Sequence, residues 1–197
     1  MKDREELDRI LTLLAEKLEL EDLGVYIIFV IGGSALLYKG LSSRPTKDVD
    51  IIAFGKMKEN TLTLTSAKPF PEELKKISGE IAEDLGLVAD WLNPGPTDLL
   101  EFGLPEDFVQ RCEKKEYGKN LTVYFIDRYD QIHFKLYAAA DQGPGRHLQD
   151  LLDLNPEKEE ISSASKWTIR QDPSEGFKKV LKEMLCELGY EDVAGRI

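Results

Sequence analysis

The sequence predicts an α+β protein with an α/β core followed by a helical C-terminal region. Strand-like apolar segments alternate with amphipathic segments as far as residue 127, and only helical segments follow. Strands alternating with helices, and then helices alone, are typical of a sheet covered by helices with a helical appendage. We therefore expect a core with an N-terminal helix over residues 1–127 and a helical region over residues 128–197.

The first segments predict a helix, a strand and a second, shorter helix. Residues 4–19 place leucine and isoleucine at helical spacing, which indicates an amphipathic helix. Residues 25–31 are mostly β-branched or aromatic and carry no charge, which is the pattern of a strand buried on both faces. A short helix is expected over residues 34–39, and the Gly, Ser and Pro content of residues 40–46 predicts a loop.

The middle of the chain predicts a strand, an ambiguous polar stretch and a helix. Residues 48–54 have the composition of a strand. The polar residues 56–71 fit either a hairpin through residues 62–64 or a loop. Residues 72–85 predict a helix, and its apolar stripe consists of Leu74, Ile77, Ile81 and Leu85.

Two short strands and a run of helices complete the predicted elements. Residues 87–91 predict a strand, which the Pro and Gly residues of positions 93–96 end. Residues 121–126 predict the last strand. Breaks in the helical region are expected at residues 142–145, 155–156 and 172–173.

Composition excludes several classes of protein. The net charge of -11 argues against a protein that wraps extended duplex nucleic acid, because neutralising phosphates needs a basic surface. Any nucleic acid partner is therefore expected to be bound locally. No apolar run approaches the roughly 20 residues that span a bilayer. The cysteines, Cys112 and Cys186, are far apart and form no CxxC, which together with the charged first residues predicts a cytoplasmic protein without a membrane segment.

Two glycines and a serine follow the buried strand directly. A helix that begins there presents unpaired backbone N–H groups, and Gly32 and Gly33 would let a phosphate approach them closely. Ser34 would add a hydroxyl donor. Taken alone, such a turn is most often only a tight connection between a strand and a helix.

Two aspartates separated by one residue open the next strand. Because side chains alternate along a strand, Asp48 and Asp50 project from one face while Val49 and Ile51 point into the core. Two carboxylates that lie so close repel each other unless a cation lies between them, so such pairs mark Mg²⁺ sites. The alternative is a pair of solvated acids at a strand end; the preceding glycine turn favours the metal site.

Glycine turn, spacer and paired aspartates together resemble the nucleotidyltransferase superfamily, which is typified by DNA polymerase β. The resemblance implies a small mixed sheet flanked by helices, an NTP substrate and two Mg²⁺ ions. It also implies a third carboxylate on a later strand. Asp90 is the first candidate and Asp127 the second, and neither need be a ligand. The residues around Asp90 are similar to those of minimal bacterial and archaeal nucleotidyltransferase-like proteins.

The second half of the chain resembles the AbiE-type toxins of the same superfamily. These proteins have a helix with a lysine, here Lys135, and then a helix with an Arg and Asp motif, here Arg146, Asp150 and Asp153. A long-stemmed lysine on an apolar helix could reach triphosphate oxygens, or it could be an ordinary lysine at a domain edge. The Arg and Asp face fits an ordinary salt-bridged surface equally well.

The resemblances imply transfer of a nucleoside monophosphate from an NTP to an acceptor hydroxyl. The acceptor could be a tRNA 3′ end, a protein side chain or a small molecule, and the protein could be a toxin with an antitoxin partner. The alternative is a catalytically silent nucleotide-binding or protein-interaction module of the same fold. The predicted catalytic residues are Asp48, Asp50, Asp90 and Lys135, with the three aspartates as metal ligands, and the predicted nucleotide-binding residues are Gly32, Gly33, Ser34, Thr46, Lys135 and Asp150.

Overall fold

The structure is a computed structural model that describes residues 1–59, 61–101 and 103–197. The chain divides into two compact units. Unit 1 comprises Met1–Gly103 and Val109–Ile126, and unit 2 comprises Leu104–Phe108 and Asp127–Ile197. The α+β class predicted from the sequence is confirmed, because unit 1 carries a mixed sheet with helices and the C-terminal part of the chain is helical.

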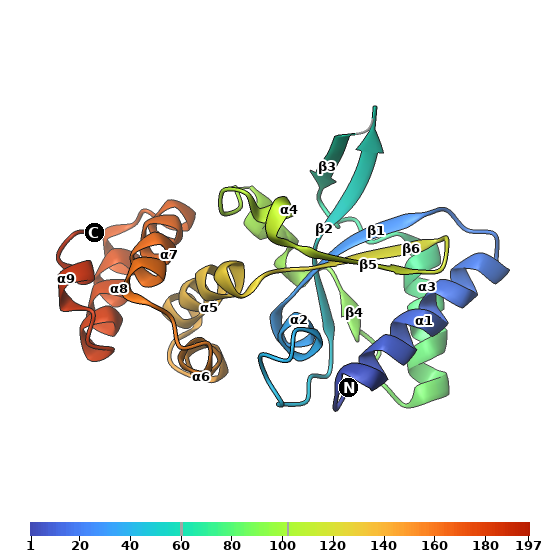
Figure 1. The fold of residues 1–197 in the computed structure, drawn as a ribbon, viewed down its shortest axis with the longest axis horizontal. Coiled ribbons are helices and arrows are strands. Elements are labelled where there is room, and N and C mark those ends of the chain that lie inside the picture. The colour runs from blue at the N-terminus through green and yellow to red at the C-terminus, as the bar shows by residue number, and fades with distance from the viewer. Residues whose placement is uncertain (60, 102) are drawn as a thin grey trace. The chain divides into compact units, whose positions relative to one another are not determined.

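Six strands among the described residues form one mixed sheet in unit 1 (Figure 1). Its order is β3-β2-β1-β6-β5, and β4 pairs with β2 off this path. The pairs β1–β6 and β2–β4 are parallel and the others are antiparallel. The strands are β1 (Tyr26–Ile31), β2 (Val49–Lys58), β3 (Thr61–Thr65), β4 (Leu92–Asn93), β5 (Glu113–Tyr117) and β6 (Leu121–Phe125).

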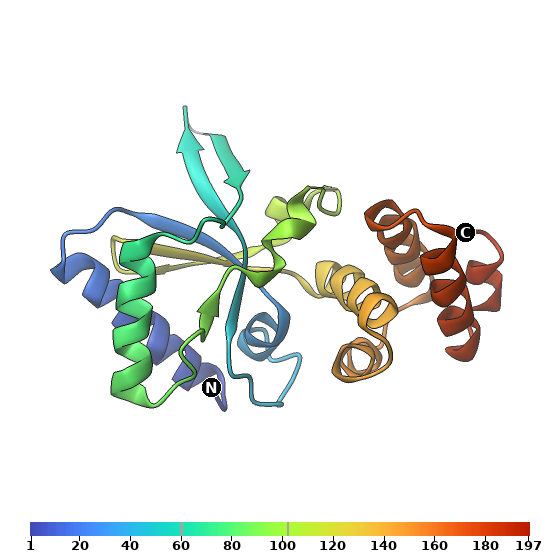
Figure 2. The ribbon, with the colours of Figure 1, turned by 180° about the vertical axis from the view of Figure 1, so that it is seen from behind.

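Two long helices pack side by side on one face of this sheet (Figures 1 and 2). They are α1 (Arg4–Leu20) and α3 (Glu72–Leu85), and both were predicted from their apolar stripes. Leu85 is the exception in the predicted stripe of α3, because it is exposed. The other helical elements before residue 112 are α2 (Gly32–Tyr38), the 3₁₀ turn η1 (Gly95–Leu100) and α4 (Phe108–Arg111).

The structure corrects the sequence-based prediction at three places in the sheet. Residues 87–91 form no strand, and the strand there is instead β4, two residues long. The charged residues Glu113–Tyr117 form the edge strand β5, which was not predicted. Of the two alternatives for residues 56–71, the structure has the hairpin, in which β3 pairs with the second half of β2.

Unit 2 carries a core of aromatic side chains around Trp167, which is fully buried. The ring of Phe134 meets the Trp167 ring edge-on, with centroids 5.2 Å apart, and His133 and Tyr137 approach it at 6.0 and 6.1 Å. The predicted helix breaks are confirmed, and a further break follows α8. The helices are α5 (Arg128–Gln142), α6 (Arg146–Asp153), α7 (Lys158–Gln171), α8 (Glu175–Glu187) and α9 (Glu191–Ala194).

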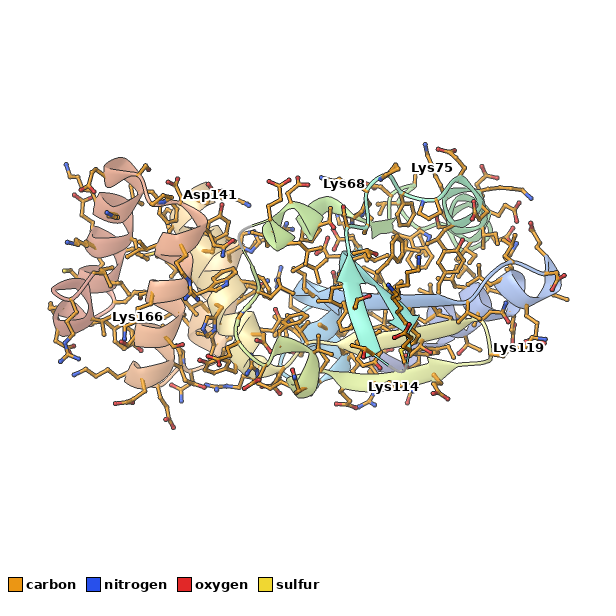
Figure 3. The ribbon with its side chains drawn as sticks, turned by 90° about the horizontal axis from the view of Figure 1, so that it is seen from above. Lys68, Lys75, Lys114, Lys119, Asp141 and Lys166 are labelled. Carbon is orange, nitrogen blue, oxygen red and sulfur yellow. The ribbon has the colours of Figure 1, made fainter. Side chains whose placement is uncertain are left out.

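Surface lysines in the described part of the chain commonly pair with acids. Lys68 lies 2.7 Å from Asp98 and Lys119 lies 2.8 Å from Glu19, and both lysines are labelled in Figure 3. Exposed pairs of this kind contribute only about 0–1 kcal/mol each. None of the helices in the described residues combines the length and the apolar content that a bilayer crossing requires.

Candidate active site

A β-bulge in β2 lies just before the paired aspartates. Phe29 of β1 is opposite Ala53, whereas Val30 is opposite Ile51, so β2 has one extra residue between these pairs. The next pair is Ile31 and Asp50. Bulges bend a strand and change the direction of the side chains beside it. The register therefore places Asp50 opposite the last residue of β1, where the chain turns into α2.

Gly32 is the residue at which β1 turns into α2, and it contacts the carboxylate of Asp50. Its φ is +72°, which favours glycine. A Cβ built on Gly32 would lie 2.7 Å from Oδ2 of Asp50, closer than side-chain carbons come to such atoms. The backbone conformation thus favours glycine here, and an added side chain would displace the Asp50 carboxylate.

Asp48 is connected to the same turn through Thr46. The Thr46 hydroxyl donates to Oδ1 of Asp48 at 3.0 Å, and it also lies 3.2 Å from the Asp48 carbonyl oxygen. A Cβ on Gly33 would lie 2.9 Å from the Thr46 Oγ1 atom. Gly32 and Gly33 are thus in contact with Asp50 and Thr46, so the glycine turn and the two aspartates converge.

The loop that carries Thr46 is held by main-chain contacts. The Thr46 N–H donates to the carbonyl oxygen of Met1 at 2.9 Å, and the Met1 amine donates to the Thr46 carbonyl at 2.6 Å. Val49 is fully buried, and its N–H donates to the Trp91 carbonyl. Asp48 therefore lies between two fixed points of the backbone.

Ser34 does not present its hydroxyl to the turn. Its side chain is fully buried, and Oγ donates to the carbonyl oxygen of Ile31 at 3.3 Å. This hydrogen bond lies within the first turn of α2 and satisfies a serine that the apolar core would otherwise leave unpaired. The hydroxyl donor expected from the sequence is therefore directed into the protein.

The side chain beside Asp50 on the neighbouring strand is Asn93. β2 and β4 run parallel, Asp50 is paired with Asn93, and Asn93 Nδ2 donates to Asp50 Oδ1 at 3.2 Å. Asp90 instead lies in the exposed turn before β4. Asp127 is the N-cap of α5, where its side chain accepts from the Tyr129 N–H. Sequence reasoning missed Asn93, and the available signal was a polar amide just before Pro-Gly-Pro.

Lys135 and Asp150 belong to unit 2 and pair with each other. Lys135 Nζ lies 2.6 Å from Asp150 Oδ2, and their side chains are 6% and 2% exposed. Breaking a buried pair of this kind costs about 3–5 kcal/mol, because one charge is left without compensation. The pair joins α5 to α6. Arg146 and Asp153, on the same helix as Asp150, are exposed.

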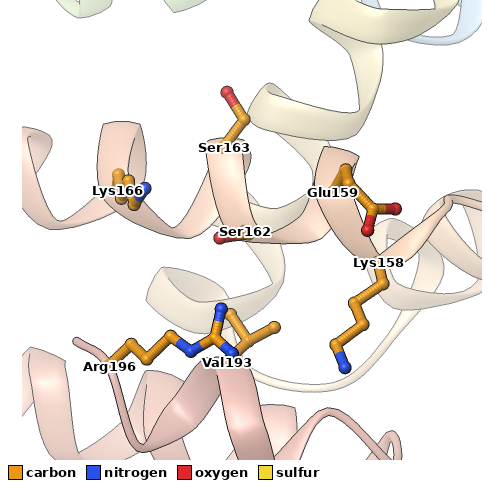
Figure 4. Close-up of a pocket in the computed structure, with 7 residues that line it drawn as sticks. All are labelled: Lys158, Glu159, Ser162, Ser163, Lys166, Val193 and Arg196. Carbon is orange, nitrogen blue, oxygen red and sulfur yellow. The ribbon is translucent and has the colours of Figure 1, made fainter.

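A cavity of about 260 Å³ in unit 2 lies between α7 and the C-terminal residues (Figure 4). Its basic lining residues include Lys158 and Arg196. Asp192 lies 2.7 Å from Lys158 and 3.7 Å from Arg196, so its carboxylate partly neutralises both. None of the residues predicted for the functional site lines this cavity.

The donor atoms at the glycine turn fit a Mg²⁺ ion that arrives with phosphates. The described residues contain no group of three His, Cys, Asp or Glu side chains that could hold a metal. Asp48 and Asp50 supply carboxylates, and Oδ2 of Asp50 lies against the turn at Gly32. Mg²⁺ in phosphoryl-transfer sites is commonly bound by one or two carboxylates together with substrate phosphates.

Comparison with known proteins identifies the family. A protein-family model described as nucleotidyltransferase of unknown function, DUF6036, matches residues 6–150, which include the glycine turn and both aspartates. No match is found among curated proteins or among solved structures. The family match covers well over half of the chain and confirms the superfamily resemblance of the sequence. The chain therefore belongs to the DUF6036 family of nucleotidyltransferases.

Proposed function

We propose that the protein transfers a nucleoside monophosphate from an Mg²⁺-bound NTP to an acceptor hydroxyl. The observation that carries this proposal is the approach of Asp50 Oδ2 to within 2.7 Å of the position of a Cβ on Gly32. It puts a metal-binding carboxylate directly beside a backbone turn suited to phosphates. Membership of a nucleotidyltransferase family supports the same chemistry.

The residues at the turn would have separate roles in binding the metal and the phosphates. Asp48 and Asp50 would hold the divalent ion on the triphosphate, and Thr46 would keep Asp48 oriented. The backbone at Gly32 and Gly33 would contact the phosphates, because the turn into α2 begins there. The bound ion would supply charge neutralisation at the triphosphate. Positioning and electrostatic stabilisation provide most of the rate enhancement in phosphoryl transfer.

The proposed step forms one bond and breaks one bond. The acceptor oxygen bonds to the α-phosphorus, and the bond between that phosphorus and the oxygen bridging to the β-phosphate breaks. Pyrophosphate leaves with the electron pair, and the acceptor proton passes to solvent or to a nearby carboxylate. Lys135, which the sequence predicts as a contact of the triphosphate, pairs with Asp150 within unit 2, and we assign it no part in this step.

RNA 3′ ends are the acceptor class that we propose first, and a toxin role with an antitoxin partner is part of this proposal. The support is the resemblance of the second half of the chain to AbiE-type toxins and the net charge of -11. An acidic protein is poorly suited to a long duplex but can accept a single chain end, because that contact involves few phosphates.

The test is transfer of label from each α-labelled NTP, with Mg²⁺, to total RNA or to a cell lysate. We expect label to enter RNA with the wild-type chain and to be lost with Asp50→Asn. Because the amide cannot bind Mg²⁺ as a carboxylate does, a loss of several kcal/mol of transition-state stabilisation, or about 10²–10³-fold in rate, is expected. NTP binding without transfer to any acceptor would contradict the proposal and favour the silent nucleotide-binding module.

A further inference from the structure

The two edges of the sheet in unit 1 differ in charge. At one edge lies β5, in which four of five residues are charged. At the other edge lies β3 (Thr61–Thr65), which alternates threonine and leucine and carries no charge. Charged side chains on an edge strand oppose pairing with another chain, whereas an uncharged edge is a template for such pairing. β3 is therefore the edge of this sheet that is suited to receive a further strand.

The outer side of β3 is accessible in the part of the chain that the structure describes. There β3 pairs with β2 alone, and Figure 1 shows that the β2–β3 hairpin projects from the rest of the sheet. The three threonines of β3 are exposed, and the two leucines between them are half-buried. An edge strand presents N–H and C=O groups on its outer side. A strand added at β3 would form its main-chain hydrogen bonds with these groups.

One face of the hairpin carries an apolar stripe that reaches this edge. Met57 of β2 is opposite Leu62, and Gly55 is opposite Leu64, so these side chains lie on the same face. Met57 is 55% exposed. A Cβ on Gly55 would lie 2.9 Å from Cδ1 of Leu62, which shows that the leucine leans over the glycine. The stripe therefore continues from β2 to the leucines of the edge strand.

The residue order of β3 is complementary to a second copy of itself. Thr-Leu-Thr-Leu-Thr reads the same in both directions. If two copies pair antiparallel about a two-fold axis at Thr63, each Thr63 lies opposite its own counterpart, and Leu62 lies opposite Leu64 of the second copy. Threonine pairs and apolar pairs both stabilise antiparallel strands. The apolar stripes of the two hairpins would then form one continuous surface.

The distribution of charge favours the same partner. The chain has a net charge of -11, so two copies repel each other where their acidic surfaces meet. β3 has no acid, and residues 53–58 of β2 contain two lysines and no acid. In the two-fold pairing, the Lys56 residues of the two copies are separated by three strand spacings, or roughly 14 Å. That separation exceeds the Debye length of about 8 Å at physiological ionic strength, so their repulsion is screened.

We propose that β3 pairs antiparallel with β3 of a second copy of this chain, about a two-fold axis at Thr63, and joins two sheets into one. The pairing uses no residue of the glycine turn or of the paired aspartates, so it is independent of the proposed function. Two paired strands of five residues bury less than the roughly 1,200–2,000 Å² of a standard interface. We therefore expect a dimer that dissociates on dilution.

The test is sedimentation of the full chain from about 1 μM to about 1 mM, the range of dissociation constants of weak complexes. We expect the mean mass to rise with concentration from that of one chain, 22.3 kDa, toward twice that value. Amide hydrogen exchange over Thr61–Thr65 should slow as the dimer forms, while exchange over Glu113–Tyr117 stays constant. The mass of one chain at every concentration would overturn the proposal and leave β3 to a strand of another protein.

The position of Thr63 on the axis allows a charge test of the register. Thr63→Lys places two lysines directly opposite each other and should raise the dissociation constant of the dimer by about five- to tenfold. Thr63→Glu should weaken the dimer by the same mechanism. A mixture of the two variants pairs opposite charges and should restore association to at least the wild-type level. An unchanged dissociation constant in Thr63→Lys, or no mixed dimer, would overturn the proposed pairing.

Thr12→Lys is the matched control, because it makes the same substitution at an exposed position of α1. It should dimerise as the wild type does, and an equal weakening would mean that net charge and not β3 governs association. The Thr63 hydroxyl donates to the Lys56 carbonyl oxygen at 3.0 Å, and both Thr63 variants lose this hydrogen bond. Its loss cannot restore a dimer in the mixture. If Thr63→Lys fails to fold in urea-unfolding controls, hydrogen exchange of the wild type decides the question.

Discussion

Gly32 and Asp50 are in contact across the β1–β2 pair, with room for a hydrogen but not for a methyl group at Gly32 beside the Asp50 carboxylate. A flexible carboxylate can move away from an added methyl group, whereas a backbone atom cannot. The contact therefore couples the identity of residue 32 to the direction of Asp50. This coupling can be measured against Gly40, which has a similar φ but no atom within 4 Å of its Cβ position.

Gly32→Ala should reduce both stability and transfer, whereas Gly40→Ala should reduce stability alone. Gly40 has φ +68° and no atom within 4 Å of its Cβ position. Alanine there should lower the free energy of unfolding only by the cost of a left-handed backbone, about 1–2 kcal/mol. Gly32→Ala adds displacement of Asp50. Urea unfolding and transfer rates of both variants test this, and equal transfer rates would show that the contact does not affect Asp50.

Thr46→Val should slow transfer while the fold is retained, and Thr46→Ser should restore it. The hydroxyl of Thr46 donates to Asp48 Oδ1, and a hydrogen bond to a charged group contributes about 1.5–3 kcal/mol. The expected loss is thus about 10–100-fold in rate. Steady-state kinetics at saturating NTP would show it as a lower kcat. If serine fails to rescue, the methyl group and not the hydroxyl matters at this position.

Lys135→Met should destabilise the protein by about 3–5 kcal/mol, because it removes the ammonium that compensates the buried carboxylate of Asp150. Asp150→Asn should be destabilising for the same reason. The double variant should lose less than the sum, and a double-mutant cycle of unfolding free energies measures the difference. Additive losses would mean that the ion pair contributes little coupling.

Tyr26 should titrate well above a free tyrosine. Burial of its hydroxyl, and then its hydrogen bond to Glu73 at 2.9 Å, raises its pKa to about 12. Because the folded pKa exceeds the unfolded value of about 10, the associated stability is complete below about pH 10 and is lost as the pH rises toward about 12. The tyrosinate absorbance difference between wild type and Tyr26→Phe measures this titration. A difference spectrum centred near pH 10 would contradict the burial of this hydroxyl.

The sequence predicted the elements whose patterns are local. The helix Glu72–Leu85 was predicted at both ends, because its apolar spacing and the following glycine are local signals. The strand Glu113–Tyr117 was missed because four of its five residues are charged, as is common at the exposed edge of a sheet. The two residues of β4 are too few to form a pattern.

The candidate site likewise contains parts with a local sequence signal and parts without one. The glycines and the paired aspartates could be predicted from neighbouring residues in the chain. Asn93 could not be, because its proximity to Asp50 depends on the register of two strands that are 43 positions apart. The burial of the Ser34 hydroxyl was also beyond the sequence, because a serine at the start of a helix can point either way.

The bulge at Ile52 divides β2 into two halves with different roles. The half before it bears Asp50 and pairs with β4, and the half after it forms the hairpin with β3. Deleting Ile52 would leave the partners of β2 across β1 unchanged while straightening the strand. A single missing codon would thus remove one fully buried side chain from the core and change the direction of Asp50, while the pairing of β1 with β2 persists.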